Sequence, residues 1–272
     1  MSIMWKWECD HDAKGVIIIV HGAFEHHGRY RWLVEMWRSN GFNVLMGDLP
    51  GQGMTSRSNR GHIDSFDEYI EEVEGWVHEA AKWELPVFIM GHSMGGLVVI
   101  RLLQEKKLPI LAAAILSSPC LGLIWHPSKF LETLSLGLNI FAPKLKVNPQ
   151  LAVDFATNNI EVQNSDVNDS LYIRKVSVRW YRELVQAMKQ AFENVNKTAD
   201  IPFLVMQGGN DKIVDKLAVR SWIDRAALKE KHFKEWENCY HEIFSESKRE
   251  LVFQYTKDFV ETRLRSLGYY IE

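Results

Sequence analysis

The sequence is poor in the residues and runs that mark several classes of protein. Its 272 residues contain three cysteines, Cys9, Cys120 and Cys239, an odd number without metal-type spacing, which argues against a disulfide framework. No apolar stretch of signal-peptide length begins the chain. The aliphatic run at residues 16–20 is too short to span a bilayer. We therefore expect a cytoplasmic protein in a reducing compartment.

A strong charge of either sign is also missing. Lysine and arginine total 32 against 35 acidic residues, the formal net charge is −3, and no basic arm or lysine-rich helix appears. The sequence therefore gives no electrostatic reason to expect nucleic-acid binding. His26 and His27 lack a third ligand at suitable spacing, so we expect surface or supporting roles for them and no metal. No cofactor is expected either.

The most informative stretch that is present is residues 86–100, PVFIMGHSMGGLVVI. An apolar run enters Gly91-His92-Ser93-Met94-Gly95-Gly96, and an apolar helical segment leaves it. A serine with glycines two before and two after it, between a strand and a helix, fits a nucleophile elbow. A phosphate-binding loop is excluded because no Gly-Lys-Ser/Thr follows. The pattern predicts Ser93 as a nucleophile whose tight turn needs the glycines and holds the hydroxyl outward.

Strands and helices alternate on either side of this elbow. Strands are expected at residues 5–8, 15–20, 42–46, 86–90, 110–116, 201–207 and 232–236. Helices between them indicate an α/β fold of the α/β-hydrolase type, a mostly parallel sheet with helices on both faces. From residue 120 to 198 the alternation stops, with helical segments and no convincing strand. We expect a core of residues 1–119 and 199–272 and an inserted helical cap, or lid, at 120–198.

The first part of the expected cap is rich in Leu, Ile, Phe and Trp, but Pro127, Gly137 and Pro143 would interrupt any long helix. One interpretation is an apolar roof over Ser93 that accepts an acyl chain and makes transient contact with a membrane surface. The other is an ordinary packed helical subdomain. Residues 171–195 are expected to form one longer helix that returns the chain to the sheet.

A serine hydroxyl needs a histidine to remove its proton and a carboxylate to orient that histidine. In α/β-hydrolases these follow in the order Ser, Asp, His, each after a strand. Asp211 follows the strand at 201–207, whereas its rival Asp215 begins a helix and is expected to cap it. His241 follows the last strand. The sequence therefore predicts Ser93, Asp211 and His241 as the catalytic residues.

Two backbone N–H groups are expected to form the oxyanion hole. One belongs to Met94, directly after the nucleophile, and the other to Ala23, in the loop after the strand at 15–20. His92 is adjacent to Ser93 and cannot fold back to serve it, so we expect it to brace the elbow. His21 is expected to support the oxyanion loop.

Several motifs together carry a family resemblance. They are His21-Gly22-Ala23 with Glu25-His26, the turn Asp48-x-Pro-Gly-x-Gly, Gly61-His62-Ile63, the elbow, Gly208-Gly209-Asn210-Asp211 and Tyr240-His241-Glu242. Across nearly the whole chain the sequence resembles the monoacylglycerol lipase and lysophospholipase family of serine hydrolases, most of all its bacterial lysophospholipase-like members. The resemblance implies that an acyl-enzyme mechanism hydrolyses the ester of a single-chain lipid. Many members have a glycine where this chain has Phe24, so that ring is a candidate for narrowing the substrate entrance.

The residues alone support only a serine hydrolase, because a fold does not fix a substrate. A small ester, a thioester or an N-terminal amide stays open as the substrate. A peptidase would need an acidic cluster for the substrate's amino terminus, for example through convergence of Glu132, Asp154 and Glu161. A non-catalytic lipid binder is the least favoured alternative, because no member of the triad is missing. Head group, acyl length and oligomeric state stay open as well.

Overall fold

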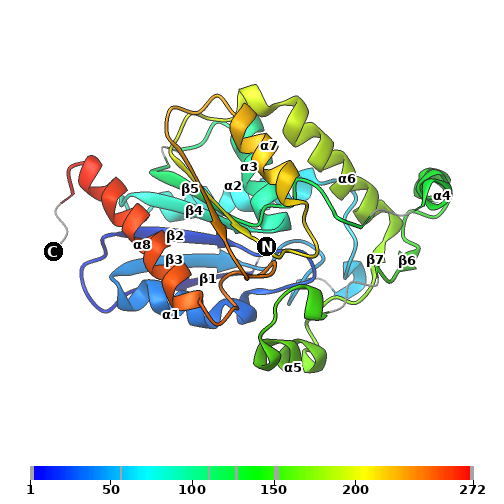
Figure 1. Ribbon diagram of the computed structural model, residues 1–272, viewed down its shortest axis with the longest axis horizontal. Helices are drawn as coiled ribbons and strands as arrows, with labels where there is room; N and C mark the ends of the chain where they lie inside the picture. Colours follow the sequence, from blue (N-terminus) through cyan, green and yellow to red (C-terminus); the bar gives the residue numbers. More distant parts are fainter. Residues whose placement is uncertain (1–2, 56, 110, 126–127, 150–152, 270–272) are drawn as a thin grey trace.

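A seven-stranded sheet runs through the protein in the computed structural model, which describes residues 3–55, 57–109, 111–125, 128–149 and 153–269 (Figure 1). The strands are β1 (Met4–Trp7), β2 (Gly15–Val20), β3 (Phe42–Gly47), β4 (Val87–His92), β5 (Ala113–Ser117), β8 (Phe203–Gly208) and β9 (Lys231–Trp236). Their order is β1-β3-β2-β4-β5-β8-β9. Only β1 runs antiparallel to its neighbour, so the expected mostly parallel sheet is confirmed.

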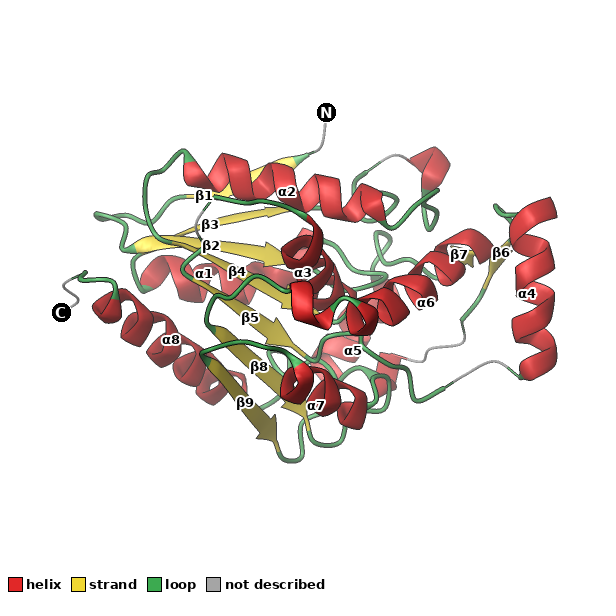
Figure 2. Cartoon of the chain, turned by 90° about the horizontal axis from the view of Figure 1, so that it is seen from above, coloured by secondary structure: helices red, strands yellow, loops and turns green. Residues whose placement is uncertain are grey.

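Every residue of β2, β3, β4, β5 and β8 is buried, as expected for parallel strands covered on both faces. Helices α1 (Arg31–Ser39) and α8 (Arg249–Ser266) cover one face, where Trp37 and Phe253 share a core cluster. Helices α2 (Asp67–Ala81), α3 (Met94–Glu105) and α7 (Lys216–Arg225) cover the other, where Trp76 and Trp222 pack. Figure 2 shows the two layers. Of the helices formed by the described residues, none combines the length and the apolar character needed to cross a membrane.

The chain between β5 and β8 leaves the sheet, and we call residues 120–198 the insertion. It contains α4 (Lys129–Phe141), β6 (Lys146–Val147), α5 (Ile160–Asn168), β7 (Val176–Ser177) and α6 (Val178–Glu193). Short 3₁₀ turns lie at His27–Tyr30, Arg57–Asn59, Val153–Phe155 and Val195–Lys197. Helix α4 stands beyond α6, away from the sheet, whereas α5 lies in a separate place beside the core (Figures 1 and 2).

Two expectations for the insertion were wrong. It does contain strands, because Val147 and Val176 pair in the short antiparallel β6–β7 ladder. The helix expected over 171–195 begins only at Val178, since the Ser177 hydroxyl caps it by accepting from the Trp180 N–H. The strand expected over 110–116 is β5, and Ile110 and Pro127 lie outside the described residues.

Polar contacts join the second half of the insertion to the loops beside the elbow. The Ile173 N–H donates to the Phe24 carbonyl at 2.9 Å, and the Ser177 N–H donates to the Gly61 carbonyl at 2.8 Å. On α6, the Trp180 indole donates to the Tyr69 hydroxyl at 2.8 Å. The insertion is therefore attached to the loop that follows β2.

Candidate active site

The turn from β4 into α3 holds Ser93 in a conformation that L-residues rarely adopt, with φ 51° and ψ −120°. The positions of the neighbouring glycines have no room for a side chain. A Cβ on Gly91 would lie 2.6 Å from the Gly95 carbonyl oxygen, and one on Gly95 would lie 2.2 Å from the Val20 carbonyl oxygen. These contacts explain physically why the serine is flanked by glycines at the ends of a strand and a helix.

A chain of hydrogen bonds starts at the Ser93 hydroxyl. Ser93 Oγ lies 2.8 Å from His241 Nε2, and His241 Nδ1 lies 2.8 Å from Asp211 Oδ2. The structure thus brings together the three side chains selected from the sequence, one after β4, one after β8 and one after β9. The rival Asp215 caps α7 instead, accepting from the Leu217 N–H at 2.9 Å, as expected.

The charges of the buried pair favour an ionised carboxylate beside a basic imidazole. Burial opposes ionisation of Asp211, but His241 and the N–H groups of Ile213 and Val214 outweigh it and lower the pKa of Asp211. Burial also disfavours protonation of His241, yet the Asp211 charge dominates and raises the pKa of His241 above its ordinary 6.5. His241 is therefore a stronger base than a free imidazole.

The two backbone amides expected to form an oxyanion hole lie beside this chain. Ala23 and Met94 line the same cavity as Ser93. Within the described ranges, neither amide donates a hydrogen bond to a protein acceptor. The Glu25 carboxylate holds the loop next to Ala23 by accepting from the Gly22 N–H at 2.8 Å.

The other histidines near the site have structural partners. His92 Nδ1 lies 3.1 Å from the Ser117 carbonyl, which braces the elbow as expected. His21 lies between the Gly22 carbonyl, at 2.8 Å from Nδ1, and the Leu49 N–H, which donates to Nε2 at 2.9 Å. Burial lowers the pKa of both imidazoles, so both stay neutral near pH 7.

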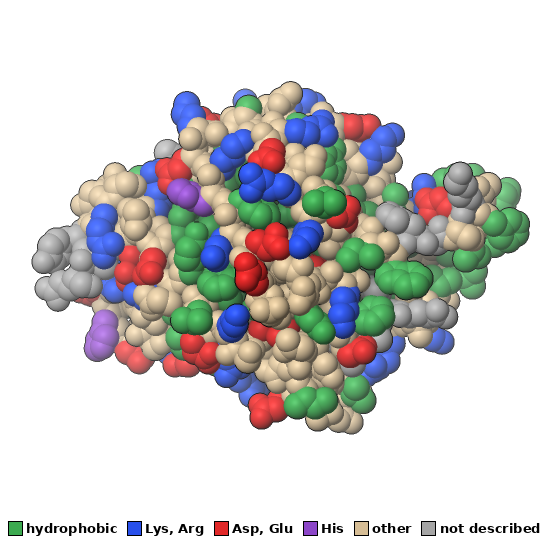
Figure 3. Space-filling model, in the orientation of Figure 1, with side chains coloured by type: hydrophobic (Ala, Val, Ile, Leu, Met, Phe, Trp, Pro, Cys, Tyr) green, Lys and Arg blue, Asp and Glu red, His purple; other side chains and the backbone are tan. Residues whose placement is uncertain are grey.

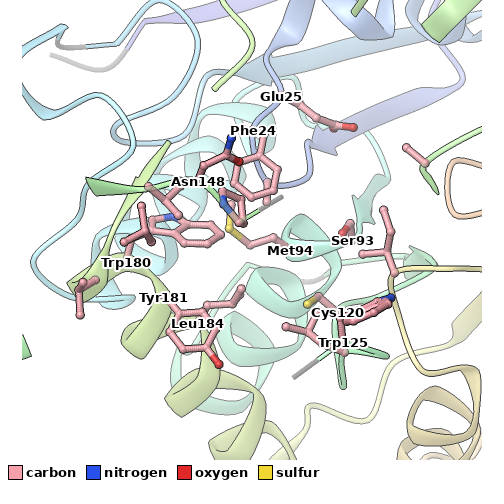
Figure 4. A pocket seen from close by; sticks show the side chains of 18 of the residues that line it. Phe24, Glu25, Ser93, Met94, Cys120, Trp125, Asn148, Trp180, Tyr181 and Leu184 are labelled. Carbon is pink, nitrogen blue, oxygen red and sulfur yellow. The ribbon is translucent and has the colours of Figure 1, made fainter. Parts of the chain in front are cut away.

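A cavity of about 510 Å³ opens beside Ser93, within the usual range of small-molecule sites (Figure 4). Most of its lining is apolar and comes from the insertion, including Leu131, Leu134, Leu138, Trp180 and Leu184. Phe24 also lines it, at φ 71°, with its ring centroid 5.4 Å from that of Trp180.

Glu132, Asp154 and Glu161 do not converge on Ser93, because none of these described residues lines the cavity beside it. Glu132 instead forms an ion pair with Arg182 on α6. The acidic cluster that a peptidase would need is therefore not formed by these three side chains.

Sequence reasoning missed two buried polar residues close to the site. Arg29 and Asp166 form a two-bond ion pair, at 2.8 Å and 2.6 Å, although 137 positions separate them. No periodicity links residues so far apart. The presence of Glu25 and Glu242 in the quoted motifs could have indicated a cationic side chain near them, because buried carboxylates need a cation nearby.

The fold and the Ser–His–Asp arrangement define an enzyme of the α/β-hydrolase class. Residues 11–248 match the family described as serine aminopeptidase, S33, and the chain belongs to this family.

Individual relatives cover nearly the whole chain. Phospholipase YtpA of Bacillus subtilis is 52% identical over 258 residues, which span 95% of this chain and 99% of the relative. The monoacylglycerol lipase of Mycolicibacterium smegmatis is 28% identical, spanning 95% and 92%. Among solved structures, the monoacylglycerol lipase of Paleococcus ferrophilus is similar with a TM-score of 0.86 and 26% identity, covering 97% of this chain and 99% of that one.

Proposed function

We propose that this protein hydrolyses the carboxylic ester of a single-chain lipid, a monoacylglycerol or a lysophospholipid. The observation that carries the proposal is the Ser93–His241–Asp211 hydrogen-bond chain beside a mainly apolar cavity of about 510 Å³. An acyl chain fits such a lining because burial of its methylenes is favourable, at about 0.8 kcal/mol each. The names of the relatives, a phospholipase and monoacylglycerol lipases, support the same substrate class.

In the proposed reaction, Ser93 Oγ attacks the ester carbonyl while His241 Nε2 takes the hydroxyl proton. The carbonyl oxygen becomes negative and accepts from the amides of Ala23 and Met94. Collapse of this intermediate breaks the ester C–O bond, and His241 gives its proton to the leaving alcohol. Water, deprotonated by His241, then releases the fatty acid from Ser93. Asp211 holds the imidazole in the tautomer with Nε2 free and stabilises its charged form.

We also propose that the insertion, residues 120–198, is a cap that contacts lipid surfaces through α4. Its exposed apolar side chains include Phe130, Ile140 and Phe141, which are 75%, 73% and 88% exposed. Figure 3 shows hydrophobic side chains gathered at this end of the molecule. A large exposed apolar patch commonly marks an interaction site, and α4 also lines the cavity. A cytoplasmic enzyme could then take substrate from a membrane while the rest of the chain stays in water.

The experiment that tests this proposal measures kcat/KM on a panel of monoacylglycerols, lysophospholipids, short esters and aminoacyl amides. We expect the highest kcat/KM on a single-chain lipid ester, with the values rising as the acyl chain lengthens until the cavity is filled. Faster cleavage of aminoacyl amides than of every ester would overturn the proposal in favour of a peptidase. The structure argues for esters, because the cavity-lining carboxylates Glu25 and Glu242 both pair with Arg29 and are not free to hold an amino group.

Phe24 is the proposed determinant of acyl shape. The residue is 8% exposed, and its ring packs beside Trp180 within the cavity. We expect Phe24→Gly to raise kcat/KM for branched or bulky acyl esters, relative to linear ones, by about tenfold, the low end of the discrimination that one methylene provides in an apolar pocket. Kinetics on matched linear and branched esters measure this ratio.

Phe24→Ala is the matched control, because it removes the ring but keeps a side chain at a positive φ. Both variants should widen the cavity, while only the glycine relieves backbone strain of about 1 kcal/mol. The Phe24→Gly variant should therefore have a higher melting temperature than the Phe24→Ala variant. Unchanged acyl preference in both variants would show that the ring does not shape the substrate entrance.

A further inference from the structure

One buried guanidinium joins three separate segments around the site. Arg29 donates to Glu25 beside the oxyanion loop, to Asp166 on α5 of the insertion, and to Glu242 directly after His241. Its Nη2 lies 2.6 Å from Asp166 Oδ2 and 3.0 Å from Glu242 Oε2. The four side chains are between 4% and 9% exposed. Such bonds between buried charges have fixed geometry, because the planar guanidinium is preorganised.

Each carboxylate holds a different part of the catalytic machinery. Glu25 accepts from the Gly22 N–H, so it fixes the peptide that leads into the Ala23 amide. Glu25 also accepts from the Tyr30 hydroxyl, at 2.6 Å. Although burial opposes it, the Arg29 charge and the hydrogen bond from Tyr30 hold the pKa of Glu25 at about 2, which keeps this carboxylate an acceptor.

Glu242 connects the base to the insertion. It is the residue after His241, and its N–H donates to the carbonyl of Ala156 in the insertion at 2.8 Å. Glu25, His92 and Glu242 offer ligand atoms within 4.8 Å of one another, a spacing that would also suit a metal ion. Arg29 supplies positive charge to both carboxylates of this group, so a cationic partner is already present.

We propose that Arg29 is a positioning residue that aligns the oxyanion loop with His241. Because Arg29 also bonds to Asp166 on α5, this alignment depends on α5 staying packed in its present position. The inference rests on the proposed serine-hydrolase function but not on the identity of the ester. When α5 moves away, Arg29 loses its two-bond partner, and the guanidinium that bridges Glu25 and Glu242 is no longer held in one orientation. Misplacement by about 1 Å is enough to cost about 10²-fold in rate.

The test compares the variants Arg29→Lys, Arg29→Gln and Asp166→Asn with the wild type. The first readout is the second-order rate of labelling by a fluorophosphonate: Ser93 Oγ bonds to phosphorus, fluoride leaves, and the hydroxyl proton passes to His241. The second readout is kcat and KM on a short-chain and a long-chain ester. Arg182→Gln is the control, because it breaks another arginine–carboxylate ion pair of the insertion, the half-buried contact with Glu132 on α4, which lies outside the Arg29 cluster.

We expect Arg29→Gln to lower both the labelling rate and kcat by about tenfold to hundredfold, on both esters, with KM changed less than about threefold. The labelling rate and kcat of Arg29→Lys should lie between those of Arg29→Gln and the wild type, since an ammonium keeps the charge but cannot reproduce the planar guanidinium. Asp166→Asn should lower both rates about three- to tenfold, and Arg182→Gln should leave the labelling rate unchanged.

Melting temperatures accompany every measurement. If Arg29→Gln and Asp166→Asn melt lower but keep wild-type labelling rates, Arg29 is merely structural and the proposal is overturned. If Arg29→Gln does not fold, Asp166→Asn decides, because it leaves Arg29 bridging Glu25 and Glu242; an unchanged rate there overturns the link to α5. If the wild type reacts with the probe but cleaves no ester, the proposed substrate class fails while the labelling rates still decide the role of Arg29.

Discussion

Ser93→Ala is expected to lower kcat for ester hydrolysis by about 10⁶-fold, the loss seen when a hydrolase loses its nucleophile. The attacking atom is removed, while the apolar cavity and the proposed oxyanion amides stay in place. Binding should therefore survive, and KM or the dissociation constant of a substrate should change little. The melting temperature should also change little, because the variant loses one hydrogen bond to His241, about 1 kcal/mol.

Ser118→Ala is the matched control for this result. Ser118 is also a buried serine with a positive φ, 44°, and it also follows a strand of the sheet. Its hydroxyl accepts from the Gly208 N–H at 3.5 Å, whereas the His241 ring is hydrogen-bonded to Ser93 and Asp211. We expect its kcat to stay within about threefold of the wild type, since no bond to the reacting atoms is lost. Hydrolysis and fluorophosphonate labelling that persist in Ser93→Ala would instead assign the nucleophile to another residue.

The sheet and the Ser–His–Asp arrangement could be read from the sequence because both follow from local pattern. Strands buried on both faces appear as short apolar runs, and the carboxyl ends of parallel strands meet at one edge of the sheet. Ser93 and Asp211 each follow such a run, and His241 follows the edge strand β9, which is only partly buried. Their spatial meeting then needs no information beyond strand order, and the structure confirms the contacts among them.

The errors lie where local pattern competes with tertiary contact. Val176 and Ser177 continue an apparently helical segment, yet they pair with β6, so α6 starts later than expected. The N-cap signal at Ser177 was present in the sequence but was weaker than the helical pattern around it. The Arg29–Asp166 pair left no periodic signal in the sequence, because a salt bridge across 137 positions depends on where the insertion folds back. Polar contacts between loops produce no periodic pattern in the sequence from which they could be predicted.

Asp211→Asn is expected to lower kcat by about 10⁴-fold, although the side chain keeps its shape. Asp211 Oδ1 accepts from the N–H groups of Ile213 and Val214, at 2.8 and 2.9 Å. These donors fix the asparagine oxygen in that position, so its NH₂ group must face His241 Nδ1. The imidazole then has to accept at Nδ1 and carry its proton on Nε2. In that tautomer it cannot remove the proton from Ser93.

The same substitution should move the pH profile, which separates an electrostatic role from simple loss of packing. In the proposed mechanism, wild-type His241 must be neutral to act as the base, and Asp211 raises its pKa above 6.5, so kcat/KM should fall as the pH decreases through that raised value. Without the carboxylate, burial dominates and lowers the pKa of His241, so the acid limb of the residual activity should shift to lower pH. Asp215→Asn, which keeps a good cap on α7, should leave both rate and profile unchanged. An acid limb that stays in place in Asp211→Asn would mean that another group sets it, and that the Asp211 charge does not tune the base.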